Sequence, residues 1–356
     1  MAQMRIPTSR LRKNMIVKSD VYTRSGVIIV PAGTEVTKDV VSLLTRHFID
    51  DVIVEYGTGE QEEKEPIVEP KRVSDEQMIA FKESFQVAEE TLSKSLKGIA
   101  DQDKDIDVNA LLGMLNKIIG TSSNEVNLCD MLFKMKQSAE NLYSHSINVA
   151  LFAQVLAKWA EFTVEEIELA GIAGLLHDIG VLKFLDENKG NFSFRDEYDK
   201  KAYDKHVVYG YNMIKDKDID SRIKQAVLAH HERLDRSGFP IGISGNGISN
   251  IARVIAIADA YDTLTMEEEG KDDISPFMVL RILEEARGKF DPKLLMLFIE
   301  RMAQDFIQYE VILSNGKRGK IVMINKFDLT RPLIQVGTTF IDLALRKDIT
   351  IVKMFE

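Results

Sequence analysis

Apolar residues follow two different periods along the chain, and the changes of period divide it into segments. Near the start, short apolar runs at Met15–Val17, Gly26–Val30 and Val52–Val54 alternate with turn signals such as Pro31-Ala32-Gly33. Runs of this length between glycine and proline are typical of β-strands. We therefore expect residues 1–56 to form a small α+β accessory module, with one short helix between its second and third strands.

The next two segments differ sharply in composition. Residues 57–76 hold two prolines, many charges and few apolar side chains, which indicates a solvated linker. Over residues 77–139 apolar positions recur every three or four residues, as in amphipathic helices, so we expect a helical connector. Its first stripe either packs within the chain or pairs two chains in a homodimer, and both interpretations stay open. The stripes are Met78, Phe81, Phe85, Ala88, Leu92 and Leu96, then Leu111, Leu112, Leu115 and Ile118.

Helix signals are densest over residues 140–306, which we expect to form the main helical domain. Thr163 with Glu166 has the spacing of a capping box, and Ser275-Pro276 and Asp291-Pro292 each place a capping residue before a proline. The fold class is therefore mainly α, a helical bundle with the small N-terminal α+β module and a short C-terminal β segment.

The period changes again in the last segment, residues 307–356. Tyr309–Ser314 alternates between apolar and polar residues, and Lys320–Ile324 is a second apolar run. Asn315-Gly316 between them favours a tight hairpin turn. We expect a β hairpin within this segment.

Composition narrows the classes of function. There are 46 basic and 56 acidic residues, for a net charge of −10, which argues against binding to a nucleic-acid polymer or an anionic membrane. No apolar run approaches the roughly 20 residues of a membrane helix, and the start lacks an apolar signal segment, so we predict a cytoplasmic location. Cys129 is the single cysteine, so no disulfide forms within the chain.

The residues that indicate chemistry are histidines and aspartates set in apolar helical segments, where each would be costly to bury without a partner. We expect His145 in the middle of a helix and His177-Asp178 at the end of a helix that Gly180 stops. Imidazole and carboxylate ligands suit Mn, Fe, Zn, Ni or Cu, and a carboxylate can bridge two cations. The set favours a binuclear metal site over separate, hydrogen-bonded histidines: His145, His177, Asp178, His206, His230, His231 and Asp259.

Six ordered motifs make the chain resemble a known family. They are HSINVA, LLHDIG, KHVVYGYNMI, AHHERLDRSGFP, RVIAIADAYDTLT and KFDP, between about Glu140 and Phe298. With this order and spacing the chain resembles the HD-GYP family, a branch of the HD-domain metal-dependent phosphohydrolases whose typical members cleave cyclic di-GMP. The resemblance implies a helical HD-domain bundle.

The resemblance also implies how the ligands are shared and what they do. One metal would be held by His145, His177, Asp178 and Asp259, and a second by His206, His230 and His231, with Asp178 as the bridge. His177 and Asp178 are the implied catalytic residues, and a bridging hydroxide would attack phosphorus. Some members bind a third metal through a glutamate where this chain has Asn141, and Glu140 is only a remote substitute. We therefore predict two divalent ions, iron or manganese.

Three departures from the family pattern bear on substrate. Val181 replaces a lysine that commonly follows HDIG, and the nearest lysine, Lys183, should point elsewhere. The namesake Gly-Tyr-Pro is Gly238-Phe239-Pro240, and Arg236 replaces a glycine two residues before it. Where the family usually has Arg-Pro-Tyr-Arg/Lys, this chain has Glu268-Glu269-Gly270-Lys271, so carboxylates stand where phosphate would be attracted. The remaining candidate substrate contacts are Arg233, Arg236 and Lys271.

Three hypotheses of function follow. The first is a metal-dependent phosphodiesterase, a hydrolase acting on cyclic di-GMP or a related nucleotide. The second is a weak or inactive HD-GYP-type signalling module that binds a nucleotide or a partner protein. The third is another HD-domain phosphohydrolase or a di-iron oxygenase. Intact ligands favour the first hypothesis, and the lost basic groups favour the second.

Overall fold

The computed structural model describes residues 4–8, 11, 15–22, 28–37, 40–41, 44, 49, 51–56, 73–135, 141–187, 203–243, 245–265 and 275–355. The chain divides into two compact units, Met1–Val68 and Glu69–Glu356, and each has its own hydrophobic core. Most of the predicted linker, and Glu140, Glu268, Glu269 and Lys271, lie outside the described residues.

The first unit is built from short antiparallel strands. β1 (Met4–Pro7), β5 (Asp51–Tyr56) and β2 (Met15–Val17) form one sheet in that order, and β3 (Val21–Tyr22) pairs with β4 (Ile28–Val30). Alternate residues of β2 and β5 point into the core, which explains their apolar period. Helical backbone at residues 40, 41 and 44 completes the predicted α+β character.

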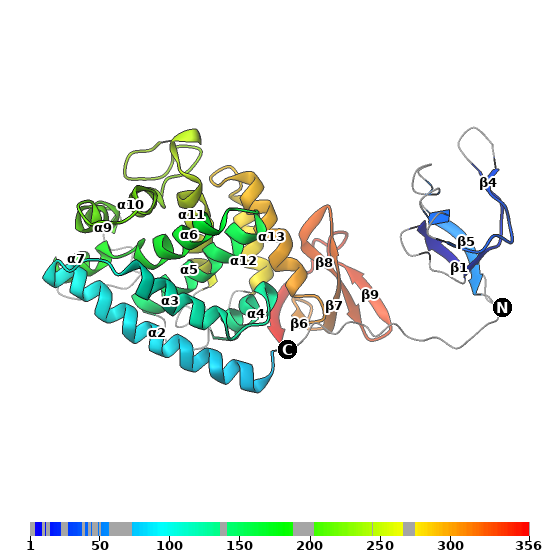
Figure 1. The fold of residues 1–356 in the computed structure, drawn as a ribbon. Helices are drawn as coiled ribbons and strands as arrows, with labels where there is room; N and C mark the ends of the chain where they lie inside the picture. The colour runs from blue at the N-terminus through cyan, green and yellow to red at the C-terminus, as the bar shows by residue number, and fades with distance from the viewer. Residues whose placement is uncertain are drawn as a thin grey trace. The chain divides into compact units, whose positions relative to one another are not determined.

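The second unit is mainly helical, which confirms the predicted fold class (Figure 1). None of the described helices is both long and apolar enough to cross a membrane. The helices are α2 (Asp75–Gln102), α3 (Val108–Ile119), α4 (Glu125–Met135), α5 (Leu142–Trp159), α6 (Val164–Leu176), α7 (Gly180–Glu187), α9 (His206–Ile214), α10 (Ser221–Ala229), α11 (Asn250–Thr265), α12 (Pro276–Glu285) and α13 (Pro292–Asp305), with a short 3₁₀ helix η2 (Gly245–Gly247).

Three helices form the centre of this unit. α5 packs against α6 and α11, and almost every residue of α5 from Ser144 to Ala157 is buried, as expected for a helix that is apolar on all sides. The long helix α2 lays its predicted stripe, from Phe81 to Leu96, into the same core. The stripe therefore packs within the chain, and a homodimer stays an untested prediction.

Helix boundaries agree with the capping signals, with one exception. The Thr163 and Glu166 capping box begins α6, and the side chains of Ser275 and Asp291 cap α12 and α13. The expectation that Gly180 stops a helix is wrong: α6 ends at Leu176, and Gly180 is the first residue of α7. The backbone turns between these helices without a positive φ, so glycine is needed at this position for another reason, given below.

The C-terminal segment forms a larger sheet than the predicted hairpin. β6 (Glu310–Leu313) and β7 (Arg318–Asn325) pair around Gly316, whose φ of 78° explains the glycine in the turn. β8 (Asp328–Val336), β9 (Thr339–Asp342) and β10 (Ile351–Phe355) complete an antiparallel sheet in the order β10-β6-β7-β8-β9. The sheet packs on α12 and α13.

Two acidic residues, Asp305 and Asp130, lie where α13 meets α4. Burial, and then the charge of Asp130, raise the pKa of Asp305 to about 7. Asp130 accepts a hydrogen bond from the hydroxyl of Tyr309 and forms an ion pair with Lys134 at 2.8 Å. Oδ2 of Asp305 has no hydrogen-bond partner among the described residues. Asp305 therefore favours its protonated form in the folded chain.

We expect an Asp305→Asn variant to gain stability relative to the native chain as pH rises from about 4 to about 7. The folded carboxyl has a higher pKa than the unfolded one, near 3.9, so it binds more protons in this window and native stability falls with pH. The gain in the free energy of unfolding should be about 2 kcal/mol. This is roughly half of what the full pKa difference between the folded and unfolded carboxyl would give, because the side chain is partly exposed to solvent. Urea unfolding at pH 4 and pH 8 measures this gain. The exposed Asp101→Asn is the control, and a gain independent of pH would contradict the assignment.

Candidate metal centre

The structure brings together all seven side chains predicted as ligands. They form two groups, Asp178 with His206, His230 and His231, and His145 with His177 and Asp259. Within each group the potential ligand atoms lie within 4.8 Å of one another, and six of the seven residues are buried. Imidazole and carboxylate groups converge here from several helices, as a metal site requires.

Helix ends position most of these residues. His177 and His230 are the capping residues at the ends of α6 and α10, and His206 is the first residue of α9. Since the helix has ended at His230, the neighbouring His231 can turn to the same centre. His145 lies in the first turn of α5, not in the middle of the helix as expected from the sequence, because α5 begins at Leu142.

Asp178 lies between the two groups. Its Oδ1 is 3.2 Å from Nε2 of His206 and 3.6 Å from Nε2 of His230. Its Oδ2 is 3.6 Å from Nε2 of His177 and 3.8 Å from Nε2 of His145. One carboxylate oxygen therefore faces each group, which is the geometry of a shared ligand.

Backbone carbonyls fix three of the imidazole rings. Nδ1 of His177, His206 and His230 donates to a carbonyl three residues earlier, at 2.7, 2.6 and 2.9 Å. A carbonyl oxygen only accepts, so Nδ1 carries the proton and the Nε2 lone pair points toward the centre. Metal-binding histidines are usually oriented in this way.

A carboxylate orients the ring of His145. Nδ1 of His145 is 2.8 Å from Oδ2 of Asp262, a fully buried residue three positions after Asp259 on α11. Nε2 of the same ring lies 3.4 Å from Oδ1 of Asp259. Helix α11 thus presents one potential ligand and one residue that orients another.

Several buried polar atoms of this centre are left for a cation to satisfy. Nε2 of His177 and of His231 has no hydrogen-bond partner among the described residues. Nε2 of His206 and Nε2 of His230 face each other at 3.5 Å, although both are acceptors when Nδ1 carries the proton. Buried polar atoms are rarely left unsatisfied in proteins, and one divalent cation in each ligand group would together satisfy all four. The residues present therefore fit a metal site.

The pKa shifts of His177, His231 and Asp178 favour the protonation states that bind metal. At His145 and His206 the carboxylates of Asp259, Asp262 and Asp178 outweigh burial and raise the imidazole pKa in the absence of a cation. Burial lowers the pKa of His177 to about 4, and burial and then His230 hold the pKa of His231 well below its usual value. Burial opposes the ionised form of Asp178, but His177 and His206 outweigh it and hold its pKa well below the usual range. Neutral imidazole and ionised carboxylate are the forms that bind metal ions.

The family comparison agrees with this geometry. Residues 127–294 match the family model described as "HD domain". Over these residues the chain is similar to HD domains. The resemblance drawn from the six motifs is therefore confirmed.

Several relatives of the chain are named as phosphodiesterases. The chain is 26% identical over 265 residues to "Cyclic di-GMP phosphodiesterase PA4108" of Pseudomonas aeruginosa, covering 72% of this chain and 64% of the relative. It is 26% identical to "Cyclic di-GMP phosphodiesterase PdeB" of Borreliella burgdorferi, covering 56% and 53%, and 29% identical to "3'3'-cGAMP-specific phosphodiesterase 2" of Vibrio cholerae, covering 44% and 31%. The chain spans less than two thirds of the length of each of these relatives.

The loop at residues 236–243 packs directly against the second ligand group. A Cβ at Gly238 would come within 2.2 Å of the His231 carbonyl oxygen and 2.5 Å of the Arg233 amide nitrogen, so only glycine fits. The ring of Phe239 then lies 4.6 Å from the ring of His231. Arg236 has a φ of 67°, in the left-handed region that favours glycine.

Two acidic residues that support the site are absent from the ligands predicted from the sequence. One is Asp262, and the other is Glu232, which is buried directly after His231. The Glu232 carboxylate accepts backbone N–H bonds from Ile241, Gly242 and Ile243 at 2.8, 3.1 and 3.0 Å, so it fastens the loop. The sequence signal was an acidic residue near a ligand: Glu232 directly follows His231, and Asp262 follows Asp259 by three residues in an apolar segment.

The candidate substrate contacts do not converge on one place as the ligands do. Nη1 of Arg233 donates to the carbonyls of His230 and Glu232, and its guanidinium stacks on Phe290, so Arg233 supports the loop. Arg236 is exposed, and Lys271 is outside the described residues. The roles of these three residues in substrate binding stay predictions.

Val181 and Lys183, the two positions after HDIG that bear on substrate, differ in exposure. Val181 is fully buried, so it offers nothing to a ligand at the surface of the centre. Lys183 is exposed, and its ammonium group lies 4.8 Å from the ring centroid of Tyr209. The lysine common at position 181 in the family has no substitute on α7 near the centre.

We expect Asp262→Asn to lower the metal affinity of the His145 group by about 10- to 100-fold, the usual cost of losing a residue that orients a ligand. The amide is a weaker acceptor for the Nδ1 proton of His145 and can present its NH₂ group to the ring instead. Manganese titration against a chelating dye measures the affinity. Asp186→Asn on the exposed face of α7 is the control, and an unchanged affinity for both ions would contradict the role of Asp262.

Proposed function

We propose that the chain is a metal-dependent phosphodiesterase that hydrolyses a cyclic dinucleotide, with cyclic di-GMP as the first candidate. The observation that carries this proposal is the Asp178 carboxylate, with one oxygen facing each of two buried ligand groups. Relatives named as cyclic di-GMP and 3'3'-cGAMP phosphodiesterases support the substrate class.

We propose two divalent ions, iron or manganese, as the cofactors. His145, His177, Asp178 and Asp259 would hold one, and Asp178, His206, His230 and His231 the other. When bound, such ions supply a water of lowered pKa and positive charge for the phosphate oxygens. At the position of a third-metal ligand, the amide oxygen of Asn141 accepts from the N–H groups of Tyr143 and Ser144. That oxygen caps α5, which supports two ions and not three.

The chain's own residues would orient and shield this centre. The carbonyl partners of Nδ1 hold the rings of His177, His206 and His230 in place before substrate arrives, so little reorganisation is needed during reaction. The ring of Tyr203 lies 4.3 Å from His206, and Phe239 lies 4.6 Å from His231. These aromatic rings cover the second group and limit the access of bulk water.

A second candidate function is a nucleotide-binding module with little or no turnover. The specific observation in its favour is the shortage of free cations near the centre among the described residues. Val181 replaces the lysine and is buried, and Arg233 donates to backbone carbonyls. A cyclic dinucleotide carries two negative phosphates, so positive charge beyond the metals matters for its affinity.

Product analysis by chromatography tests the proposal. Protein purified without air and loaded with manganese or ferrous iron is incubated with cyclic di-GMP or 3'3'-cGAMP, beside an Asp178→Ala control. We expect a linear dinucleotide or mononucleotide that depends on metal and is absent with the control. Binding of either nucleotide without product would favour the second candidate. Consumption of dioxygen by the ferrous protein would favour a di-iron oxygenase.

A further inference from the structure

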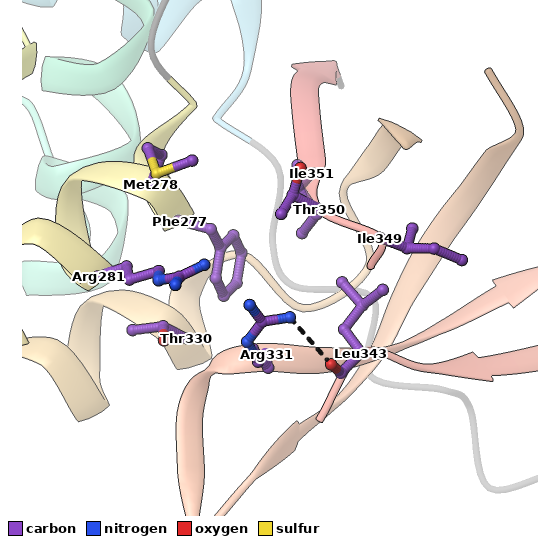
Figure 2. Close-up of a pocket in the computed structure, with 9 residues that line it drawn as sticks. All are labelled: Phe277, Met278, Arg281, Thr330, Arg331, Leu343, Ile349, Thr350 and Ile351. Carbon is purple, nitrogen blue, oxygen red and sulfur yellow. Dashed lines mark hydrogen bonds between the residues drawn. The ribbon is translucent and has the colours of Figure 1, made fainter. Parts of the chain in front are cut away.

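A pocket opens where α12 meets strands β8 and β10, and none of its lining residues belongs to the metal centre (Figure 2). It is a shallow, open pocket, and its space of about 300 Å³ includes solvent at the mouth. Phe277 and Leu343, both buried, form apolar walls, and Arg331 and Arg281 contribute the cations. The pocket therefore combines apolar walls with two guanidinium groups.

The buried cation of this pocket is Arg331 on β8, which is only 8% exposed. Its Nη1 donates to the carbonyl oxygen of Leu343 at 3.2 Å, and Figure 2 shows this bond between the two residues. Within the described part of the chain, its guanidinium makes no other hydrogen bond and has no carboxylate within 4.0 Å. A guanidinium has five N–H donors, and burying it with so few acceptors is costly. The remaining donors are available to a bound anion.

A second cation lies at the mouth of the pocket. Nε of Arg281 is 3.0 Å from Oε1 of Glu285 in the next turn of α12, and both side chains are substantially exposed. Exposed pairs of this kind are weak, so an entering anion can replace Glu285 as the partner of Arg281. Glu284 binds the hydroxyl of Thr330 at 3.2 Å, so that hydroxyl is already used.

We propose that this pocket binds a small organic anion, whose phosphate or carboxylate group pairs with Arg331 while its apolar body lies against Phe277 and Leu343. Small-molecule sites characteristically combine apolar walls with a few converging polar groups. A planar guanidinium binds either anion through two parallel N–H bonds. The site is independent of the proposed phosphodiesterase activity.

Ligand-observed NMR titration of the full chain with four probes tests this site. The probes are phenyl phosphate, benzoate, inorganic phosphate and phenol. We expect phenyl phosphate or benzoate to bind more tightly than inorganic phosphate, which lacks the apolar body, and than phenol, which lacks the anion. Binding that persists in Asp178→Asn excludes the metal centre as its location. Failure of both organic anions to bind at millimolar concentration, or equal binding of phenol, overturns the proposal.

Matched variants locate the binding. Arg331→Met should weaken phenyl phosphate or benzoate binding by about 10-fold or more, the usual cost of losing hydrogen bonds to a charged group. Arg318→Met, at an exposed arginine of β7, should leave it unchanged. Circular dichroism confirms that each variant is folded. If Arg331→Met does not fold, Met278→Trp at the rim should block the pocket while Arg331 stays in place. Native affinity in a folded Arg331→Met or Met278→Trp overturns the assignment.

Discussion

Asp178→Asn is expected to hold no more than one divalent ion per chain and to lose about 10³-fold in phosphodiester hydrolysis. Each Asp178 oxygen faces a different ligand group, so the side chain can serve two ions only as a carboxylate. An amide offers one oxygen and no charge, and it leaves the remaining histidines to share a centre of reduced negative charge. Removing electrostatic stabilisation at a reacting group typically costs this much in rate.

Metal analysis by plasma mass spectrometry and product chromatography measure both parts of this prediction. Asp186→Asn, on α7 but exposed, is the matched control and should keep both ions and the native rate. Two ions per chain in a folded Asp178→Asn would refute the bridging assignment. Loss of the ions with full hydrolysis would refute the metal dependence of the reaction.

Gly180→Ala is expected to destabilise the fold by about 3 kcal/mol and to weaken the second metal group by about 10- to 100-fold. A Cβ at Gly180 would lie 2.0 Å from the His206 carbonyl oxygen and 2.4 Å from the Gly210 amide nitrogen. Both atoms are backbone atoms of α9, so α9 as a whole must move away from α7. His206 is the first residue of α9 and would move with it.

Gly113→Ala is the control for this prediction. Gly113 lies inside α3, and a Cβ there has no atom within 4 Å. Alanine is a better helix former than glycine, so this variant should be up to about 1 kcal/mol more stable than the native chain. Urea unfolding and manganese titration of the two variants make the comparison. If the two variants had similar stability and similar metal affinity, the close approach of α7 and α9 would not be what positions His206.

The sequence predicted best those features that depend on neighbouring residues. The capping box of Thr163 and Glu166 and the Asn315-Gly316 turn each satisfy backbone groups within a few residues, so their patterns are short and complete. The seven candidate ligands were found through motifs of the same local kind. The structure adds that they converge, which no single motif contains.

The sequence was less informative where a residue's role depends on a distant segment. Gly180 is needed because α9 approaches it, and Asp262 matters because His145 lies opposite, 117 positions away. The Glu232 carboxylate fastens the loop at residues 236–243 through N–H groups that lie nine to eleven residues later in the chain. β8 extends the C-terminal sheet beyond the predicted hairpin because it packs on α12 and α13, and that helix surface is defined only after the helices pack. β9 then pairs with β8.

The orientation of the histidines before metal binding has a consequence for handling the protein. The centre joins α5, α6, α9, α10 and α11, and the unfolded chain keeps none of this arrangement. Under the two-ion assignment, each ion therefore acts as a ligand of the native state and adds about 2.7 kcal/mol of stability at a free concentration 100 times its dissociation constant. The melting temperature of a preparation then rises with metal occupancy and falls on dialysis against a chelator. Batches with different melting temperatures then differ in the fraction of chains that hold metal. A thermal scan therefore ranks batches by metal occupancy before any activity assay.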